Sequence, residues 1–112
     1  MAEKGDFICE AVEIDGHVVG WAEVIKIKKE KVPSAGLGFI CLAEEFRGKG
    51  ISEELLRRVE SDAQQKWGVK RITAQTSVKN KRARRFYLKN GFIEKGLVKD
   101  REEYIELEKD LE

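Results

Sequence analysis

An apolar run, a glycine-bearing turn and an amphipathic segment follow one another in the middle of the chain, and this succession constrains the fold most. Residues 36–43 lack polar alternation, which predicts a strand buried on both faces. Residues 51–67 predict a helix that ends at Gly68. The apolar stripe of this helix is Ile51, Leu55, Leu56, Val59, Ala63 and Trp67. Glu53 and Glu54 lie in its first turn, where the helix dipole favours negative charge.

The segments before this unit predict a hairpin. Residues 7–14 and 18–27 are rich in strand formers, and Asp15-Gly16 between them is a strong signal for a tight turn. The basic stretch over residues 26–34 holds the only proline, and it predicts a loop or a fraying strand end.

The segments after the helix predict three more strands and a second helix. Residues 71–78 alternate as a half-buried strand does. Asn80 is a good N-cap for a helix that reaches Lys89, and Asn90-Gly91 ends it. Residues 92–98 and 104–111 predict two closing strands.

The resulting order, β-β-β-α-β-α-β-β, predicts an α/β (α+β) fold with a mixed, mostly antiparallel sheet and two helices packed on it. The 112 residues are 41 % hydrophobic, which is enough for one core and excludes a disordered chain. No repeat or linker divides the sequence. We therefore expect one domain over residues 1–112.

Charge and cysteine content limit the partners and the compartment. The 22 basic and 21 acidic residues leave a net charge of +1, so no overall field attracts nucleic acid or membrane. The polar N-terminus, Met1 to Gly5, lacks a signal-peptide pattern, and we expect a cytoplasmic protein. Cys9 and Cys41 lie in apolar segments and predict reduced core thiols; a disulfide or a reactive thiol is less favoured. One histidine and two isolated cysteines favour no metal site.

The turn before the first helix is the first candidate site. It reads Arg47-Gly48-Lys49-Gly50-Ile51-Ser52, and its glycines allow a ligand to approach the backbone closely. Free N–H groups at a helix start, together with these cations, favour a phosphate or pyrophosphate. The alternative is an ordinary turn with surface cations. The turn matches neither the dinucleotide-binding fingerprint nor a Walker loop.

The second helix is the second candidate site. Asn80 can cap the helix or hydrogen-bond an amide-bearing ligand. Tyr87 shares a face with Ala83 and offers a hydroxyl, unless it is simply a core aromatic. Six cations follow one another without an acid, as a solvated face or a polyanion patch: Lys79, Lys81, Arg82, Arg84, Arg85 and Lys89.

These two motifs, in this order, resemble those of the GNAT superfamily of acyl-CoA-dependent N-acyltransferases. The family's phosphate-binding motif, Arg/Gln-x-x-Gly-x-Gly/Ala, stands here at residues 47–52. Its second motif, Asn-x-x-Ala-x-x-x-Tyr, stands at Asn80, Ala83 and Tyr87, followed by Gly91-Phe92. The resemblance covers about residues 7–111 and implies a GNAT-like sheet.

The sequence departs from the family pattern in three places. On this resemblance the chain begins at the family's second strand, without the first strand and the two helices that form much of the acceptor pocket. Ser52 replaces the last Gly or Ala of the phosphate motif and is small enough to keep it. Gln75 stands where relatives that acetylate protein N-termini often have a glutamate base.

The resemblance implies that an amine attacks acetyl-CoA directly, with no metal and no covalent enzyme intermediate. Pantetheine would pair with the strand at Cys41, Leu42 and Ala43, and the N–H of Leu42 would polarise the thioester carbonyl. The residues implied to cradle the pyrophosphate are Arg47, Gly48, Lys49, Gly50, Ile51 and Ser52. Asn80 would anchor the pantetheine arm, in the motif that includes Ala83, and Tyr87 would act as general acid.

No residue stands out as the general base. Glu13 and Glu23 lie on predicted strands, and for both we favour a solvent-facing position. Water can take the proton instead, or the amine can arrive neutral.

We therefore expect a small N-acetyltransferase whose acceptor amine the sequence does not identify. The first alternative is an acyl-CoA-binding domain with little or no transferase activity. The second is a nucleic-acid binder that uses residues 79–89, although the acidic C-terminal segment balances that charge. Uncovered sheet edges near the N-terminus lead us to expect a homodimer.

Overall fold

A six-stranded sheet and two helices make up the structure, a computed structural model that describes residues 4–28 and 30–111. The elements are β1 (Phe7–Ile14), β2 (His17–Ile27), β3 (Ser34–Leu42), α1 (Ile51–Trp67), β4 (Arg71–Ser77), α2 (Lys81–Lys89), β5 (Ile93–Val98) and β6 (Arg101–Asp110). Short 3₁₀ turns occupy Lys4–Asp6 and Glu44–Phe46. The predicted order and fold class are confirmed. The expectation drawn from Met1 to Gly5 concerns in part residues 1–3, and the predicted loop includes Lys29; these positions lie outside the described ranges.

The local signals place most boundaries correctly. Asp15 and Gly16 both have positive φ, as the tight turn between β1 and β2 requires. Gly68 ends α1 in the left-handed conformation. Strand β6 begins at Arg101, three residues before the predicted start. The sequence pattern missed these residues because they are exposed and charged.

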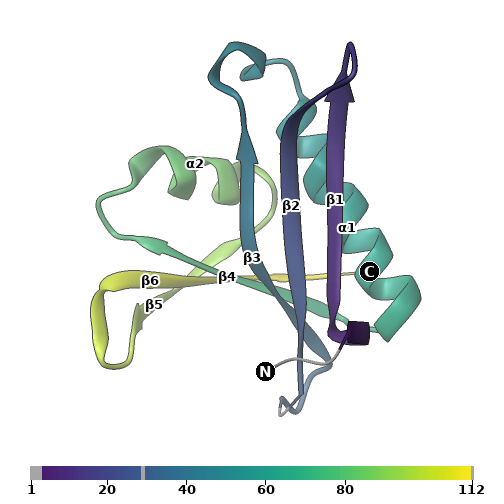
Figure 1. Ribbon diagram of the computed structural model, residues 1–112. Helices are drawn as coiled ribbons and strands as arrows, with labels where there is room; N and C mark the ends of the chain where they lie inside the picture. The colour runs from purple at the N-terminus through teal and green to yellow at the C-terminus, as the bar shows by residue number, and fades with distance from the viewer. Residues whose placement is uncertain (1–3, 29, 112) are drawn as a thin grey trace.

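The sheet order is β1-β2-β3-β4-β6-β5, and β3 with β4 is its one parallel pair. That pair is short: only Ser34–Gly36 of β3 lies opposite Arg71–Thr73 of β4. Beyond these residues β4 turns away with β6 and crosses the direction of β1 to β3 (Figure 1). The sheet is therefore split between its two central strands.

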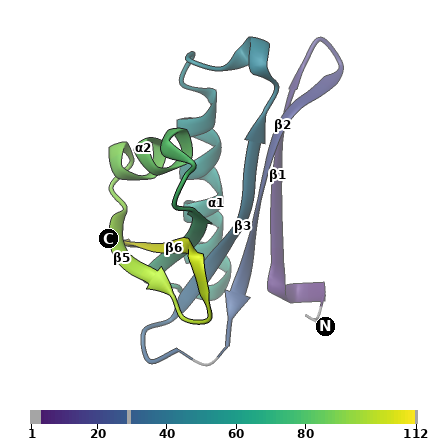
Figure 2. The same ribbon diagram turned by 90° about the vertical axis from the view of Figure 1, so that its left-hand side faces the viewer.

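Both helices cover the same face of the sheet (Figure 2). Helix α1 buries Leu55, Leu56 and Val59 completely or nearly so against the first three strands, and each such side chain contributes roughly 1.5–3 kcal/mol. Helix α2 lies beside the split and places Tyr87 against Phe92, with ring centroids 5.1 Å apart. The aromatic side chains of α2 therefore line the split from the side of the helices.

The prediction that residues 36–43 are buried on both faces is wrong. The face of β1 to β3 opposite the helices is open, and Phe39 and Cys41 on β3 are exposed there. Cys9 on β1 is also exposed, so the prediction of two core thiols is wrong as well. Apolar composition identifies a strand, but it does not show whether a second layer covers it.

The described residues include no helix that is long and apolar enough to span a membrane.

A buried ion pair ties α1 to β6. The Lys109 ammonium donates to both carboxylate oxygens of Glu60, each at 3.0 Å. The Glu60 side chain is 9 % exposed and that of Lys109 24 % exposed, so the pair is largely removed from water. Removing one partner of such a pair leaves an uncompensated charge, which is far more costly than losing an exposed pair.

We therefore expect Lys109→Met to lower the free energy of unfolding by about 3 kcal/mol, because it strands the Glu60 carboxylate. Denaturant unfolding of the variant measures this loss. Lys95→Met, at an exposed position of β5, is the matched control and should change stability little. Equal losses in the two variants would contradict the role of the pair.

Candidate functional site

A cavity of about 310 Å³ lies at the wide end of the split, between β3 and α2; we call it the first cavity. Seven residues singled out in the sequence line it: Cys41, Leu42, Arg47, Ser52, Asn80, Ala83 and Tyr87. Three more line it: Ile40, Phe86 and Arg82, the last named in the sequence analysis only as part of the basic row. Ala43, Gly48, Lys49, Gly50 and Ile51 do not line it, although they adjoin residues that do.

The backbone of β3 presents unpaired polar groups to this cavity. The N–H of Ala43 donates to Val19 O of β2 at 2.7 Å. Since successive N–H and C=O groups of a strand point to opposite sides, those of Leu42 point away from β2 and into the split. The same alternation directs the backbone groups of Ile40 there. One of these backbone groups, the carbonyl of Leu42, accepts a hydrogen bond from Arg47 Nε at 3.2 Å.

The start of α1 is suited to an anion. Gly48 and Gly50 have φ of 79° and 80°, a conformation that glycine adopts without strain. Gly50 is the N-cap and supplies no side-chain hydrogen bond, so the first N–H groups of α1 have no partner within the helix. The carboxylates of this turn are matched by cations. Oε2 of Glu54 lies 2.8 Å from a guanidinium nitrogen of Arg57, and Oε2 of Glu53 lies 3.8 Å from Nζ of Lys89.

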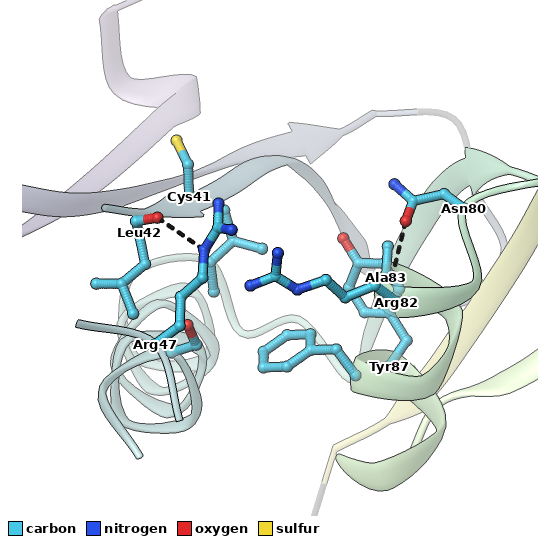
Figure 3. A pocket seen from close by; sticks show the side chains of 10 residues that line it. Cys41, Leu42, Arg47, Asn80, Arg82, Ala83 and Tyr87 are labelled. Carbon is cyan, nitrogen blue, oxygen red and sulfur yellow. Dashed lines mark hydrogen bonds between the residues drawn. The ribbon is translucent and has the colours of Figure 1, made fainter. Parts of the chain in front are cut away.

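Asn80 caps α2, and so the first of its two predicted roles is confirmed. Its Oδ1 accepts from the N–H of Ala83 at 3.0 Å (Figure 3). The cap uses the oxygen of the side-chain amide and leaves the nitrogen as a donor. The second role, a hydrogen bond to a ligand, stays a prediction.

Tyr87 is both a core aromatic and a cavity residue. Its side chain is 7 % exposed and packs between Phe86 and Phe92. Burial raises the pKa of the Tyr87 phenol above its ordinary value, so the hydroxyl stays protonated at neutral pH.

The basic row of α2 is not a uniform patch. Arg84 pairs with Glu94 of β5 at 2.7 Å and also donates to Val78 O at 2.8 Å. The hydrogen bond from Arg84 to Glu94 lowers the pKa of the Glu94 carboxyl. No acid interrupts these cations in the sequence, but Arg84 is neutralised by a carboxylate from another element, so it is not available to a polyanion. Arg82 instead extends over the cavity, facing Arg47 from the opposite wall (Figure 3).

The candidate bases lie outside the first cavity. Glu13 is exposed on β1, and Glu23 is half-buried on β2. Gln75 lies exposed on β4. No carboxylate lines the first cavity, and across the described ranges no three His, Cys, Asp or Glu side chains gather as metal ligands do.

Comparison with known proteins gives a consistent result. The model of the "Acetyltransferase (GNAT) family" matches residues 2–92. Uncharacterized N-acetyltransferases of Mycobacterium bovis and Mycobacterium tuberculosis are 35 % identical over 78 residues, which cover 70 % of this chain and 47 % of theirs. The chain thus spans about half the length of these curated relatives.

Solved structures share the fold. PaiA N-acetyltransferase from Thermoplasma acidophilum, in complex with coenzyme A, superposes with a TM-score of 0.83 at 24 % identity, over 94 % of this chain and 61 % of that one. A GNAT family acetyltransferase from Elizabethkingia anophelis with acetyl-CoA bound gives 0.78 at 20 % identity, over 95 % and 77 %.

The cap at Asn80 yields a test of its own. Asn80→Ala removes the acceptor for the Ala83 N–H and should lower the free energy of unfolding by about 1 kcal/mol. Asn80→Asp keeps an acceptor oxygen at the same place and should leave stability near that of the parent chain. Thermal unfolding of both variants checks this. If the two variants lose equal stability, the hydrogen bond to Ala83 does not stabilise α2.

Proposed function

We propose that this chain, which belongs to the acetyltransferase (GNAT) family, binds acetyl-CoA in the first cavity and transfers its acetyl group to a primary amine. The observation that supports this best is the backbone N–H of Leu42, which points away from β2 toward the cavity, next to an α1 start without a side-chain cap. A ligand that has backbone-like amides at one end and a pyrophosphate at the other satisfies both. Coenzyme A is such a ligand.

The pantetheine arm pairs with β3 as an added strand. Its amides exchange hydrogen bonds with the backbone groups of Ile40 and Leu42 that point into the split. The donor nitrogen of Asn80 reaches the arm from the opposite wall. Cys41 and Ala43, which the sequence analysis also assigned to this contact, direct their backbone groups toward β2 and help only by extending the strand.

The pyrophosphate lies at the start of α1. The free N–H groups of Ile51 and Ser52 and the helix dipole hold it, and the turn of Gly48 and Gly50 allows its approach. Arg47 and Lys49 add positive charge. The Lys49 ammonium rests 5.7 Å from the ring of Phe46, and it can swing to a phosphate.

The transfer is a single displacement at the thioester carbon. The amine nitrogen attacks this carbon, the new C–N bond forms, and the C–S bond breaks. A β3 N–H that faces the cavity, that of Leu42 or that of Ile40, donates to the carbonyl oxygen as negative charge develops there. The Tyr87 hydroxyl donates its proton to the leaving thiolate, and the amine proton passes to water.

The absence of a carboxylate from the lining of the first cavity makes a second function possible, an acyl-CoA-binding domain without transfer. To distinguish the two functions, thiol release from acetyl-CoA is measured with a series of amines. Binding of acetyl-CoA is measured in parallel by calorimetry. Binding without release with any amine favours the second function. The homodimer expected from the sequence stays a prediction.

Gly50→Val should abolish acetyl-CoA binding while the fold survives. Valine at a φ of 80° costs about 1–2 kcal/mol and displaces the backbone that faces the pyrophosphate. Gly68→Val is the matched control, because Gly68 also has positive φ and open surroundings but lies at the other end of α1. It should cost similar stability and leave binding unchanged. Calorimetric titration compares the two, and tight binding by folded Gly50→Val would exclude this site.

Tyr87→Phe should lower kcat roughly ten- to a thousandfold while the affinity for acetyl-CoA stays nearly the same. The change removes only the hydroxyl and keeps the ring between Phe86 and Phe92. A proton donor to the leaving thiolate acts mainly in the transition state, so its loss appears in turnover and not in ground-state binding. Steady-state kinetics with any active acceptor measures the effect. Unchanged kcat would remove Tyr87 from the mechanism.

A further inference from the structure

A second cavity, of about 470 Å³, opens at the narrow end of the split, where β3 and β4 separate. Six of its residues matter here: Gly36, Gly38, Thr73, Gln75, Arg101 and Tyr104. Thr73 and Gln75 alternate along β4 with Ile72 and Ala74, which are buried beneath the helices. The second cavity therefore lies on the open face of the sheet, away from α1 and α2.

The two glycines of this cavity have no structural requirement. Neither has positive φ. A methyl built on Gly36 would lie 3.6 Å or more from its neighbours, and one on Gly38 would lie 3.5 Å or more away, both ordinary contacts. Glycine weakens a strand relative to residues with side chains. What these glycines provide is space, which indicates room for a ligand.

The polar groups around this space have opposite charges. The Arg101 guanidinium lies over the ring of Tyr104, with Cζ 4.0 Å from the ring centroid. Within the described residues it has no carboxylate partner, so its N–H donors remain available. On the β3 side, the position of a methyl on Gly38 is 3.5 Å from Oε1 of Glu23. The lining of the cavity thus includes a cation from β6, and the Glu23 carboxylate, which is outside that lining, lies beside Gly38.

We propose that the second cavity binds the acceptor and that Arg101 makes the chain selective for primary amines that also carry a carboxylate. This proposal rests on the acetyl transfer proposed above. The acceptor carboxylate hydrogen-bonds to the Arg101 guanidinium, whose planar fork suits two parallel bonds. The amine lies near Gly38 and Glu23, beside the stretch of β3 that continues into the first cavity.

Charge-assisted hydrogen bonds of this kind raise affinity roughly ten- to a hundredfold. The test uses straight-chain amino carboxylates, from glycine to 6-aminohexanoate, each against the alkylamine of the same length. The parent chain should favour the best amino carboxylate by that factor in kcat/KM. Arg101→Gln should remove the preference. Lys99→Gln, which removes a cation from the same hairpin outside the cavity, should keep it.

A second readout does not depend on turnover. The backbone amide signals of Gly36 and Gly38 are followed by NMR while the amino carboxylate is titrated, with and without coenzyme A. We expect saturable shifts in the parent chain and in Lys99→Gln, and none in Arg101→Gln. Such shifts without thiol release would refute the transfer and leave the cavity assignment standing.

Two outcomes would overturn this proposal whatever the turnover: equal binding of amino carboxylate and alkylamine by the parent chain, or an undiminished preference in Arg101→Gln. Gly38→Ala adds a check on the space itself. Because its methyl meets only ordinary contacts, it should keep or raise thermal stability. It should also weaken the NMR-detected binding, and unchanged binding would refute the claim that the glycine provides room for the acceptor.

Discussion

The early end of the pairing between β3 and β4 is the constraint on which the rest of the structure depends. After Gly36 and Thr73 the two strands share no backbone hydrogen bonds, so the groups of β3 that point toward β4 need other partners. Arg47 supplies one for Leu42 O. The remaining backbone groups of β3 form an open strand edge, and a ligand that contains amides can pair with such an edge as an added strand.

The split stays open because each half of the sheet is held by its own partners. Strand β4 pairs over its whole length with β6, and β6 is tied to α1 through Lys109 and Glu60. Strand β3 pairs with β2, where Gly20 allows the close approach: a methyl there would lie 2.8 Å from Cδ1 of Leu42. The aromatic contacts of Tyr87 fill the gap beneath. The cavity walls are therefore set before any ligand arrives.

The sequence predicted what depends on neighbouring residues and missed what depends on distant ones. The hairpin at Asp15, the cap at Asn80 and the end of α1 at Gly68 are local, and all three are confirmed. The open face that exposes Cys41 depends on where the helices dock, which periodicity does not show. The pairing of Arg84 with Glu94 likewise joins two elements. Arg82 had a usable signal, since helical spacing places it on the face of Phe86.

The distribution of charge also differs between the two cavities. Arg47 and Arg82 face each other across the first cavity, and no carboxylate lines it. An ammonium group that entered there would meet two cations at short range, whereas the anionic end of coenzyme A would meet complementary charge. On the open face Glu23 offers the opposite sign beside Gly38. If the chain transfers acetyl to an amine as proposed above, this distribution of charge favours the approach of the amine from the face without helices.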